Sequence, residues 1–388
     1  MNEQAQQLCA AAAAQLQADG CGAANWAAVA PGRVNLIGDH TDYSGGLAMP
    51  MAVNLYTVAA AAPAKSGDNI NIRSSGQAQA ASFACGSIPT PQGDWADYLR
   101  GVYAGYMARG IGVPPMDIMI SGNLPIGAGL SSSASLEICF ALLIEAISGH
   151  TLNAADRAAL CQKAEHDYAG VPCGILDQSA IANARAGHAM LLDCRSLEFE
   201  YLPMSAAPLL AVVDSGVRHQ LADGGYADRL REVRAAEAVM GKSLRDCDAQ
   251  DLQELTDSTL QRRARHVLSE NQRVRAFAGA IRSTDFAEAG RILFASHQSL
   301  AEDFAVSCAE LDALVALAAE AGALGARMTG GGFGGSMVCL LEPSRGPEIE
   351  EHIRSNYRGE QSHAAFLRWV TPASGPWAGP WPRPVSTL

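Results

Sequence analysis

Lysine is nearly absent from this chain of 388 residues, occurring only as Lys65, Lys163 and Lys242. The formal net charge is −12, which argues against nucleic acid or an anionic membrane as the main partner. A small phosphorylated ligand is still compatible with this charge. Its negative charge would then have to be met by arginine, by a metal ion such as Mg²⁺ or by the positive end of a helix dipole.

Signals for several other protein classes are also missing. The ten cysteines form no C-x-x-C pair and no Cys/His ligand spacing, so we expect reduced, mostly buried thiols and a cytoplasmic protein. The N-terminal region lacks a basic stretch followed by a strong apolar run, and we expect neither a signal peptide nor a transmembrane helix. No internal repeat or low-complexity linker is visible. The sequence does not indicate an oligomeric state.

Two short segments match nucleotide-binding motifs in their letters, but the sequence around each does not fit the motif. Gly330, Gly332 and Gly335 spell G-x-G-x-x-G, but a strand pattern follows them where a dinucleotide-binding fold requires a helix. Gly241-Lys242-Ser243 resembles the end of a P-loop, but Ala236 replaces the required first glycine and the segment lies within helical sequence. Neither a Rossmann site nor a Walker A site is expected.

The composition is that of a folded globular protein, with 48% hydrophobic and 18% charged residues. The length allows two domains of ordinary size. A Pro-Met-Ser-Ala-Ala-Pro stretch at 203–208 separates two strand patterns. We therefore expect one domain over residues 1–205 and a second over residues 206–388.

The segment that organises the chain is the Gly- and Ser-rich stretch 124–135, which joins an expected strand at 116–121 to an expected buried helix at 136–147. A helix start presents unpaired N–H groups and a partial positive charge, which favour an anion. Glycines let the backbone approach a ligand, and serines can cap the helix, bind phosphate or ligate Mg²⁺. The residues alone leave open whether this is a nucleotide-phosphate site or a serine-capped helix after a flexible turn.

A second polar cluster lies in the segment 31–46, where Asp39, His40 and Asp42 fall within four residues of a glycine-bounded loop. Such a cluster suits a metal ion or several sugar hydroxyls, although a solvated turn has the same composition. Arg33 lies among apolar residues just before it, and a buried arginine needs a carboxylate partner.

Hydrophobic periodicity and turn residues predict the remaining elements. Helices are expected at 2–18, 93–109, 153–168 and 348–357 and over most of 223–320. A further helix is expected to begin near Asp177. Strands are expected at 26–30, 47–62, 69–74, 188–194, 199–202, 209–214, 324–328, 337–341 and 364–370, with 47–62 paired to 69–74 and 188–194 paired to 199–202. The Pro- and Trp-rich tail from 371 shows no periodicity.

Three segments, GRVNLIGDHTDYSGG (32–46), LPIGAGLSSSAS (124–135) and MTGGGFGG (328–335), resemble in this order the three signature motifs of the GHMP small-molecule kinases. The first segment, together with CGILDQ (173–178), LLDCRSL (191–197) and the helix start at Tyr226, is similar to galactokinases in particular. The resemblance covers the chain from about Ala30 to Val370. It implies an α+β fold with an N-terminal mixed α/β domain, a C-terminal ferredoxin-like domain and the active site between them, and we expect the tail to pack back on a domain.

The resemblance also implies a role for individual residues, with galactose, ATP and Mg²⁺ as the ligands. Asp177 would be the general base on the C1 hydroxyl, and Arg33 would lie beside it. Sugar contacts are expected from Asp39, His40, Thr41, Asp42, Gly174 and Tyr226. Nucleotide contacts are expected from Ser75, Trp95, Gly127, Ala128, Gly129, Leu130, Ser131, Ser132 and Ser133, with Ser133 and Glu165 as Mg²⁺ ligands and the glycines of 330–335 closing around the substrates.

Asp39 departs from the family pattern, because galactokinases usually carry Glu at this place, facing the C6 end of the sugar. Asp shortens the reach by one methylene, ~1.5 Å of chain. Either a shifted loop offsets the difference, or discrimination at C6 is relaxed.

The function implied is ATP-dependent formation of α-D-galactose 1-phosphate for galactose catabolism. The alternatives are a related kinase for N-acetylgalactosamine, a uronic acid, arabinose, mevalonate or homoserine, and a non-catalytic sensor of sugar and ATP. The cluster of His40 and Asp42 speaks against mevalonate and homoserine. The presence of Asp177, Arg33 and an uninterrupted SSSAS run at 131–135 speaks against the sensor.

Overall fold

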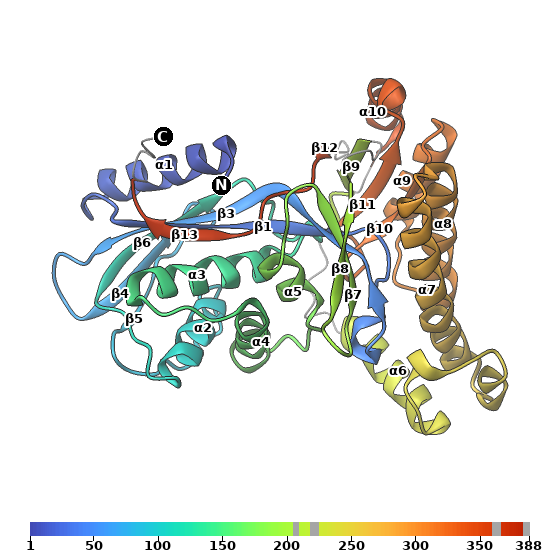
Figure 1. Ribbon diagram of the computed structural model, residues 1–388, viewed down its shortest axis with the longest axis horizontal. Coiled ribbons are helices and arrows are strands. Elements are labelled where there is room, and N and C mark those ends of the chain that lie inside the picture. Colours follow the sequence, from blue (N-terminus) through green and yellow to red (C-terminus); the bar gives the residue numbers. More distant parts are fainter. Residues whose placement is uncertain (205–208, 218–224, 359–365, 383–388) are drawn as a thin grey trace.

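The computed structural model describes residues 1–204, 209–217, 225–358 and 366–382. It has two lobes, with the helices and sheet of the first 200 residues on the left of Figure 1 and the helices α6 to α10 on the right. The expected domain seam at 203–208 falls largely on residues 205–208, which lie outside the described residues, as do the first two residues of the strand expected at 364–370.

The first lobe and the hairpin next to it contain α1 (Glu3–Ala18), β1 (Trp26–Asn35), β2 (Leu47–Ala48), β3 (Pro50–Pro63), β4 (Asn69–Ser74), β5 (Ala81–Ala84), α2 (Asp97–Met107), β6 (Met116–Gly122), α3 (Ser132–Ser148), α4 (Ala154–Ala164), α5 (Leu176–Ala182), β7 (His188–Asp193) and β8 (Phe199–Pro203). The second lobe and the tail contain β9 (Leu209–Asp214), α6 (Gly225–Met240), α7 (Ser258–Arg282), α8 (Phe286–Ser299), α9 (Ala309–Glu320), β10 (Gly325–Thr329), β11 (Ser336–Leu341), α10 (Gly346–Asn356), β12 (Phe366–Val370) and β13 (Trp377–Pro380).

A six-stranded sheet in the order β13-β1-β3-β6-β4-β5 forms the first lobe. Helix α1 packs on one face, and α2, α3 and α4 cover the other (Figure 1). The predicted pairing of β3 with β4 is wrong, because β6 lies between them, antiparallel to β3 and parallel to β4. The patterns of β3 and β4 follow one another in sequence and so suggest a pair. Neither pattern shows that β6, about 40 residues further along the chain, lies between them.

The tail returns to this first lobe. β13 pairs antiparallel with β1, with Trp26 opposite Pro380, although the sequence of the tail shows no strand pattern. Trp377 and Trp381 pack against the apolar face of α1 and the sheet beneath it. A strand of this kind at a sheet edge needs only one ladder of hydrogen bonds, so its four residues carry little alternating signal.

The second lobe is built on a four-stranded sheet in the order β10-β11-β9-β12, whose three strand pairs are antiparallel. Alternate residues of β9 face opposite ways, as the pleat requires. Leu210 and Val212 join a core with α7 and α8, while Ala211 and Val213 pack against α9 and α10. This sheet with helices on it agrees with the expected C-terminal domain.

Two elements next to the expected ligand loops differ from the sequence prediction. β1 continues from Ala30 to Asn35, with a register shift between Pro31 and Gly32. Such a bulge tolerates a proline and a glycine inside a strand. The sequence analysis had ended the expected strand at Ala30, just before these two residues. Helix α3 begins at Ser132, four residues earlier than expected, so Ser132 and Ser133 form its first turn.

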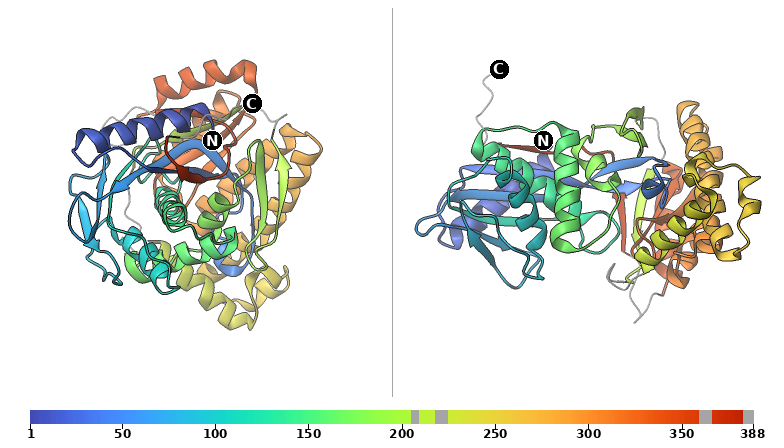
Figure 2. Two further views of the ribbon diagram at one scale, coloured as in Figure 1. Left: turned by 60° about the vertical axis from the view of Figure 1, so that its left-hand side comes forward. Right: turned by 90° about the horizontal axis from the view of Figure 1, so that it is seen from below.

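The small sheet β2-β7-β8 lies between the two lobes and contains the hairpin that the sequence predicted. The right-hand view of Figure 2 shows the two lobes along one long axis, with this region between them. All ten cysteines are free thiols. In the described ranges, no helix is long and apolar enough to cross a membrane.

Candidate active site

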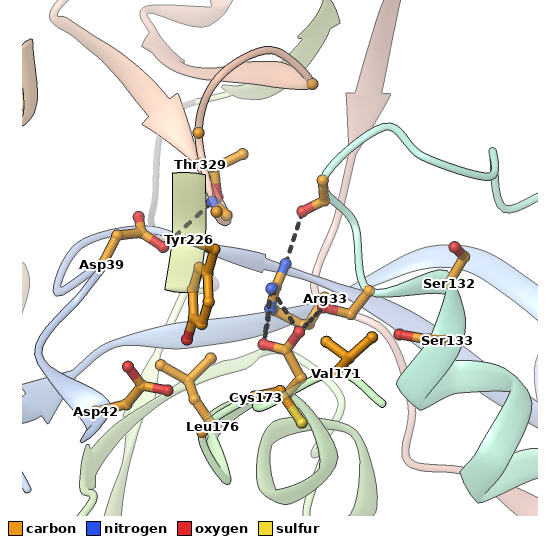
Figure 3. A pocket seen from close by; sticks show the side chains of 18 of the residues that line it. Arg33, Asp39, Asp42, Ser132, Ser133, Val171, Cys173, Leu176, Tyr226 and Thr329 are labelled. Atoms are coloured by element: carbon orange, nitrogen blue, oxygen red, sulfur yellow. Dashed lines mark hydrogen bonds and ion pairs between the residues drawn. The ribbon is translucent and has the colours of Figure 1, made fainter. Parts of the chain in front are cut away.

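A cavity of about 210 Å³ lies where the two lobes meet. It is lined by Arg33, Asp39, His40, Asp42, Gly127, Gly129, Ser131, Ser132, Ser133, Glu165, Val171, Cys173, Gly174, Leu176, Asp177, Tyr226, Thr329, Gly330, Gly331, Gly332, Gly334 and Gly335. Figure 3 shows Arg33 in the middle, with Asp39, Asp42 and Tyr226 on one side and Ser132 and Ser133 on the other. Segments that are up to 300 residues apart in sequence thus form one site.

Arg33 and Asp177 form a two-pronged ion pair at the centre of this cavity. The Nε and Nη2 atoms of Arg33 donate to the two carboxylate oxygens of Asp177 at 2.7 and 2.8 Å. Arg33 is buried near the end of β1 and also donates from Nη1 to the carbonyl of Gly129. The Asp177 side chain is 29% exposed, against 6% for Arg33, so the carboxylate faces the cavity. The carboxylate partner that Arg33 requires is therefore Asp177.

The Gly- and Ser-rich loop contacts this pair directly. Ser131 adopts a left-handed conformation with φ of 57°, and its hydroxyl donates to Asp177 at 2.5 Å. Helix α3 begins with the next residue, so its free N–H groups open onto the cavity beside Asp177. The loop is therefore a helix start that points at a ligand space, and one of its serines supports the carboxylate there.

The two glycine-rich loops lie against each other. A side chain at Gly129 would meet the Thr329 carbonyl at 3.0 Å, and one at Gly330 would meet the Gly129 carbonyl at 3.0 Å. Both residues also have positive φ, near 74° and 86°. Glycine is favoured at both positions because each has a positive φ and a Cβ atom there would be in tight contact with the facing backbone.

Glu165 lies at the other end of the serine loop, immediately after α4. Burial, followed by the charge of Asp177, raises the pKa of Glu165 to about 7, although hydrogen bonds from Cys173, Ser133 and Gln178 lower it. A buried carboxylate next to a serine hydroxyl at a helix start that favours an anion suits Mg²⁺, which takes one or two protein oxygens and completes its shell with phosphates and water. Within the described residues, no group of three or more acidic, Cys or His side chains is arranged to hold a metal alone.

The opposite wall of the cavity carries the loop residues His40 and Asp42 together with Tyr226. His40 is 5% exposed and makes contacts with the Gly331 carbonyl at 3.2 Å and the Tyr43 hydroxyl at 3.1 Å. Burial lowers the pKa of His40 to about 3, so the ring is neutral. Burial, followed by the charge of Asp177, raises the pKa of Asp42 to about 7. This wall therefore presents neutral donors and acceptors together with a carboxyl group, as polyhydroxylated ligands require.

Asp42 also explains the glycine at 174. A Cβ atom on Gly174 would lie 1.7 Å from Asp42 Oδ2. The carboxyl group therefore occupies the space of the missing side chain, and the two sugar-site candidates fix each other's positions.

Asp39 is held by a residue that the sequence analysis missed. Its Oδ2 atom accepts from Nη2 of Arg327 at 2.6 Å, and its Oδ1 atom accepts from the backbone N–H of Gly330 at 3.2 Å. Arg327 is fully buried in β10. Its place immediately before the glycine-rich motif at 328–335 and inside an apolar strand was the one available signal, the same signal that had marked Arg33.

The backbone around Asp39 is held by the second lobe as well. The Glu270 carboxylate accepts from the N–H of Gly38 at 3.0 Å, and a ring nitrogen of His266 lies 3.2 Å from the Asp39 carbonyl. Burial would raise the pKa of Glu270, but the guanidinium groups of Arg327 and Arg273 outweigh burial and lower it to about 2. An ionised carboxylate thus supports the loop from α7.

A second, shallower cavity of about 120 Å³ adjoins the first and shares Ser132 with it. It contains Ser75 and Trp95, the two residues expected on the nucleotide side, together with Ile126 and Leu136. Its mixed apolar and polar lining, next to the helix start of α3, suits a nucleoside whose phosphates reach the serine loop.

Three of the expected site residues do not line either cavity. Thr41 is fully buried, and its hydroxyl lies 3.0 Å from the Gly38 carbonyl and 2.8 Å from the Leu47 carbonyl. The side chains of Ala128 and Leu130 are also buried, that of Leu130 in the core between the lobes. These three residues shape the loops from behind.

Several lining residues were not predicted, namely Val171, Cys173, Leu176 and Thr329. The first three belong to the segment around CGILDQ, where the resemblance implied a role only for Gly174 and Asp177. The Thr329 hydroxyl lies 3.0 Å from both the backbone N and the carbonyl O of Asn35, which ties the glycine-rich loop to β1. Nothing in the sequence around Thr329 indicates that its hydroxyl contacts β1.

Three family models match the chain. They are described as the galactokinase galactose-binding signature, over residues 19–63, the GHMP kinases N terminal domain, over residues 97–185, and the GHMP kinases C terminal domain, over residues 277–359. The matched segments contain the loop at 31–46, the Gly- and Ser-rich loop at 124–135 and the glycine-rich loop at 328–335 respectively.

Named relatives are similar over most of the chain. The galactokinase of Bos taurus is 42% identical over 343 residues, covering 85% of this chain and 87% of the relative. The galactokinase of Thermococcus kodakarensis is 40% identical over 328 residues, covering 84% and 92%.

The fold has close counterparts among solved structures. The crystal structure of Lactococcus lactis galactokinase complexed with galactose has a TM-score of 0.88 at 29% identity and covers 95% of this chain and 98% of that one. Mevalonate kinase of Methanococcus jannaschii has a TM-score of 0.70 at 17% identity, covering 90% and 99%, which shows a shared fold alone.

Proposed function

The chain belongs to the galactokinase family of the GHMP kinases, and on this premise we propose that it transfers the γ-phosphoryl group of ATP to the C1 hydroxyl of α-D-galactose. The observation that carries the proposal is the position of the Arg33–Asp177 pair, between a wall of sugar-type hydrogen-bonding groups and the start of helix α3. A hydroxyl held by the first wall and a phosphate held by the second would meet at Asp177. We place the reaction in the cytoplasm, in keeping with ten free thiols.

Asp177 is proposed as the general base. A carboxylate offers about four lone-pair sites, and Arg33 and Ser131 donate to three of them. The remaining site faces the cavity, where it can accept the proton of the sugar hydroxyl. Arg33 holds the carboxylate in this orientation and offsets the negative charge that gathers on the attacking oxygen.

The phosphates of ATP would lie at the start of α3, where backbone N–H groups and the helix dipole favour an anion. Ser133 and Glu165 would hold Mg²⁺ there. When bound, the metal neutralises charge on the phosphate oxygens and orients them. The adenosine would occupy the cavity lined by Ser75 and Trp95.

Asp39, His40, Asp42, Gly174 and Tyr226 would hold the sugar. The Asp39 carboxyl group is held by Arg327 and Gly330, and the neutral His40 ring contacts Tyr43 and Gly331, so little ordering remains to be done on binding. This wall is a preorganised acceptor surface for several hydroxyls.

The test is ADP release with ATP and Mg²⁺ over a panel of acceptors: galactose, 2-deoxygalactose, N-acetylgalactosamine, galacturonate, L-arabinose, glucose and mevalonate. We expect galactose to give the highest kcat/KM. A clear preference for another acceptor contradicts the proposed substrate while keeping the reaction. Binding of galactose and ATP without turnover of any acceptor contradicts the kinase and supports a sensor.

A further inference from the structure

Arg327 lies behind the sugar-side wall and does not line the cavity, yet it contacts a residue that does. Its guanidinium is fully buried, donates from Nη2 to the Asp39 carboxylate at 2.6 Å and donates from Nη1 to the Leu36 carbonyl at 3.1 Å. Glu270 lies 4.0 Å away on the other side. The arginine therefore joins the loop of the first lobe to β10 and α7 of the second.

The geometry leaves one face of Asp39 free for a ligand. Arg327 and the Gly330 N–H occupy one position on each carboxylate oxygen and the Asn35 side chain approaches a third, so about one of the four lone-pair sites remains. The Asp39 side chain is part of the cavity lining, although it is only 7% exposed. Burial raises the pKa of Asp39 and the Arg327 guanidinium acts in the opposite direction, so the arginine favours the ionised form, which is the stronger acceptor.

Arg327 is costly to the fold as well as useful. Its Nε–H has no hydrogen-bond partner among the described residues, although it is buried. A buried donor without a partner destabilises the folded protein. A pair of apolar residues would fill the same space without that cost, so a role in binding accounts better for the arginine than a role in stability alone.

On the basis of the proposed function, we propose that Arg327 is a positioning residue for sugar specificity. It holds the Asp39 carboxyl group against β10, as the acceptor for one particular hydroxyl of the sugar. Arg327 thereby sets how strongly the site distinguishes galactose from the analogue that lacks this hydroxyl, without touching the sugar or the reacting atoms.

The experiment compares Arg327→Met with the unaltered protein on galactose and on its 2-, 3-, 4- and 6-deoxy analogues. Loss of a charge-assisted hydrogen bond corresponds to about 1.5–3 kcal/mol, or ~10- to 100-fold. We expect kcat/KM to fall by this factor for galactose and three of the analogues. For the one analogue that lacks the hydroxyl facing Asp39, expected from the resemblance to be the 6-deoxy sugar, we expect a change below ~3-fold.

Two further variants keep the test decisive if Arg327→Met does not fold. Asp39→Asn preserves the side-chain volume and removes the charge from the other partner, and it should give the same sugar-dependent pattern. Arg327→Lys keeps a charge but not the planar fork and should restore part of the discrimination that Met or Asn loses.

A matched control is the pair formed by Arg157 and Glu145, which is equally buried, with a contact of 2.7 Å, but lies among the helices of the first lobe away from both cavities. Arg157→Met should lower the melting temperature while changing kcat/KM by the same factor for all five sugars.

The outcomes separate the inference from the function on which it rests. If the unaltered protein does not phosphorylate galactose, the proposed function fails. If it does, but Arg327→Met and Asp39→Asn reduce kcat/KM equally for all five sugars, Arg327 is only a structural residue and the inference is overturned. One insensitive analogue, shared by both variants, supports it.

Discussion

On the sugar side of the cavity, Asp39 and His40 are 6% and 5% exposed and are bonded to residues of the second lobe. On the phosphate side, Ile126 is 60% exposed, Gly127 is exposed, and the loop makes few side-chain hydrogen bonds apart from that of Ser131. One wall is thus a set of side chains fixed by distant partners, and the other is mainly backbone that awaits a ligand.

The difference follows from what each wall would bind. A neutral sugar supplies no charge, so specificity has to come from donors and acceptors held in position before binding. A phosphate chain carries its own charge and attracts N–H groups and a metal, so a helix start with flexible glycines is enough. Asp177 lies at the junction, bonded to Arg33 in the middle of the cavity and to Ser131 on the phosphate side.

The largest effect is expected where the walls meet. Asp177→Asn should lower kcat by at least ~10²-fold, because the amide cannot take the proton from the sugar hydroxyl. Steady-state rates, with galactose and ATP binding followed by calorimetry, check it. Asp167→Asn, at an exposed carboxylate paired with Lys163, is the control and should be near normal. Near-normal turnover of a folded Asp177→Asn would remove the base from the mechanism.

The next effect concerns the charges that support the sugar side. The pKa of Glu270 is lowered to about 2, so its contribution to stability is present above its unfolded pKa and is lost as the pH falls from about 4.5 towards 2. Glu270→Gln should cost on the order of 3 kcal/mol near pH 7, and the difference from the unaltered protein should shrink with acidification.

Urea unfolding at a series of pH values measures this difference. Glu288→Gln on α8, where the carboxylate is 39% exposed beside Arg291, is the control and should show a much smaller change with pH. A pH-independent difference for Glu270→Gln would mean that Glu270 is not ionised by its arginine partners in the folded protein.

A smaller effect is expected from crowding on the sugar side. In Gly174→Ala the new methyl group would displace Asp42, whose Oδ2 lies 1.7 Å from that position. Galactose binding should weaken by ~10- to 100-fold, as for the loss of a hydrogen bond to a charged group, with little change for ATP. Gly279→Ala in α7, where a Cβ atom meets nothing within 4 Å, is the control. Equal weakening of galactose and ATP would contradict the separation of the two walls.

The smallest effect is expected on the phosphate and nucleotide side of the site, which is the more exposed one. Trp95→Ala should raise the KM for ATP by ~5- to 10-fold, at the lower end of the range for an aromatic ring against a base, and leave galactose binding unchanged. Trp369→Ala, at a partly exposed position on β12, is the control. If Trp95→Ala leaves the KM for ATP unchanged, the second cavity is not the nucleoside site.

Much of the site was predictable because its signals are local. Asp39, His40 and Asp42 cluster within four residues, and a strand, a glycine-serine loop and a helix follow one another without a gap at 116–148. The hairpin β7-β8 was predicted for the same reason, since its two strands are neighbours in sequence. The pairing of β3 with β4 was predicted wrongly by the same logic, because a later strand was inserted between them.

The sequence by itself determined the chemistry of each segment: an anion-favouring helix start at the Gly- and Ser-rich stretch 124–135, a cluster of acceptors at 39–42 and a buried arginine at 33 that needs a carboxylate. Only the tertiary structure brought Asp177 to Arg33 from 144 residues away and Arg327 to Asp39 from 288 residues away. The physical reason is that helix starts and turns depend on neighbours along the chain. A buried charge, in contrast, depends on whatever packing places beside it, and packing is decided by the whole fold.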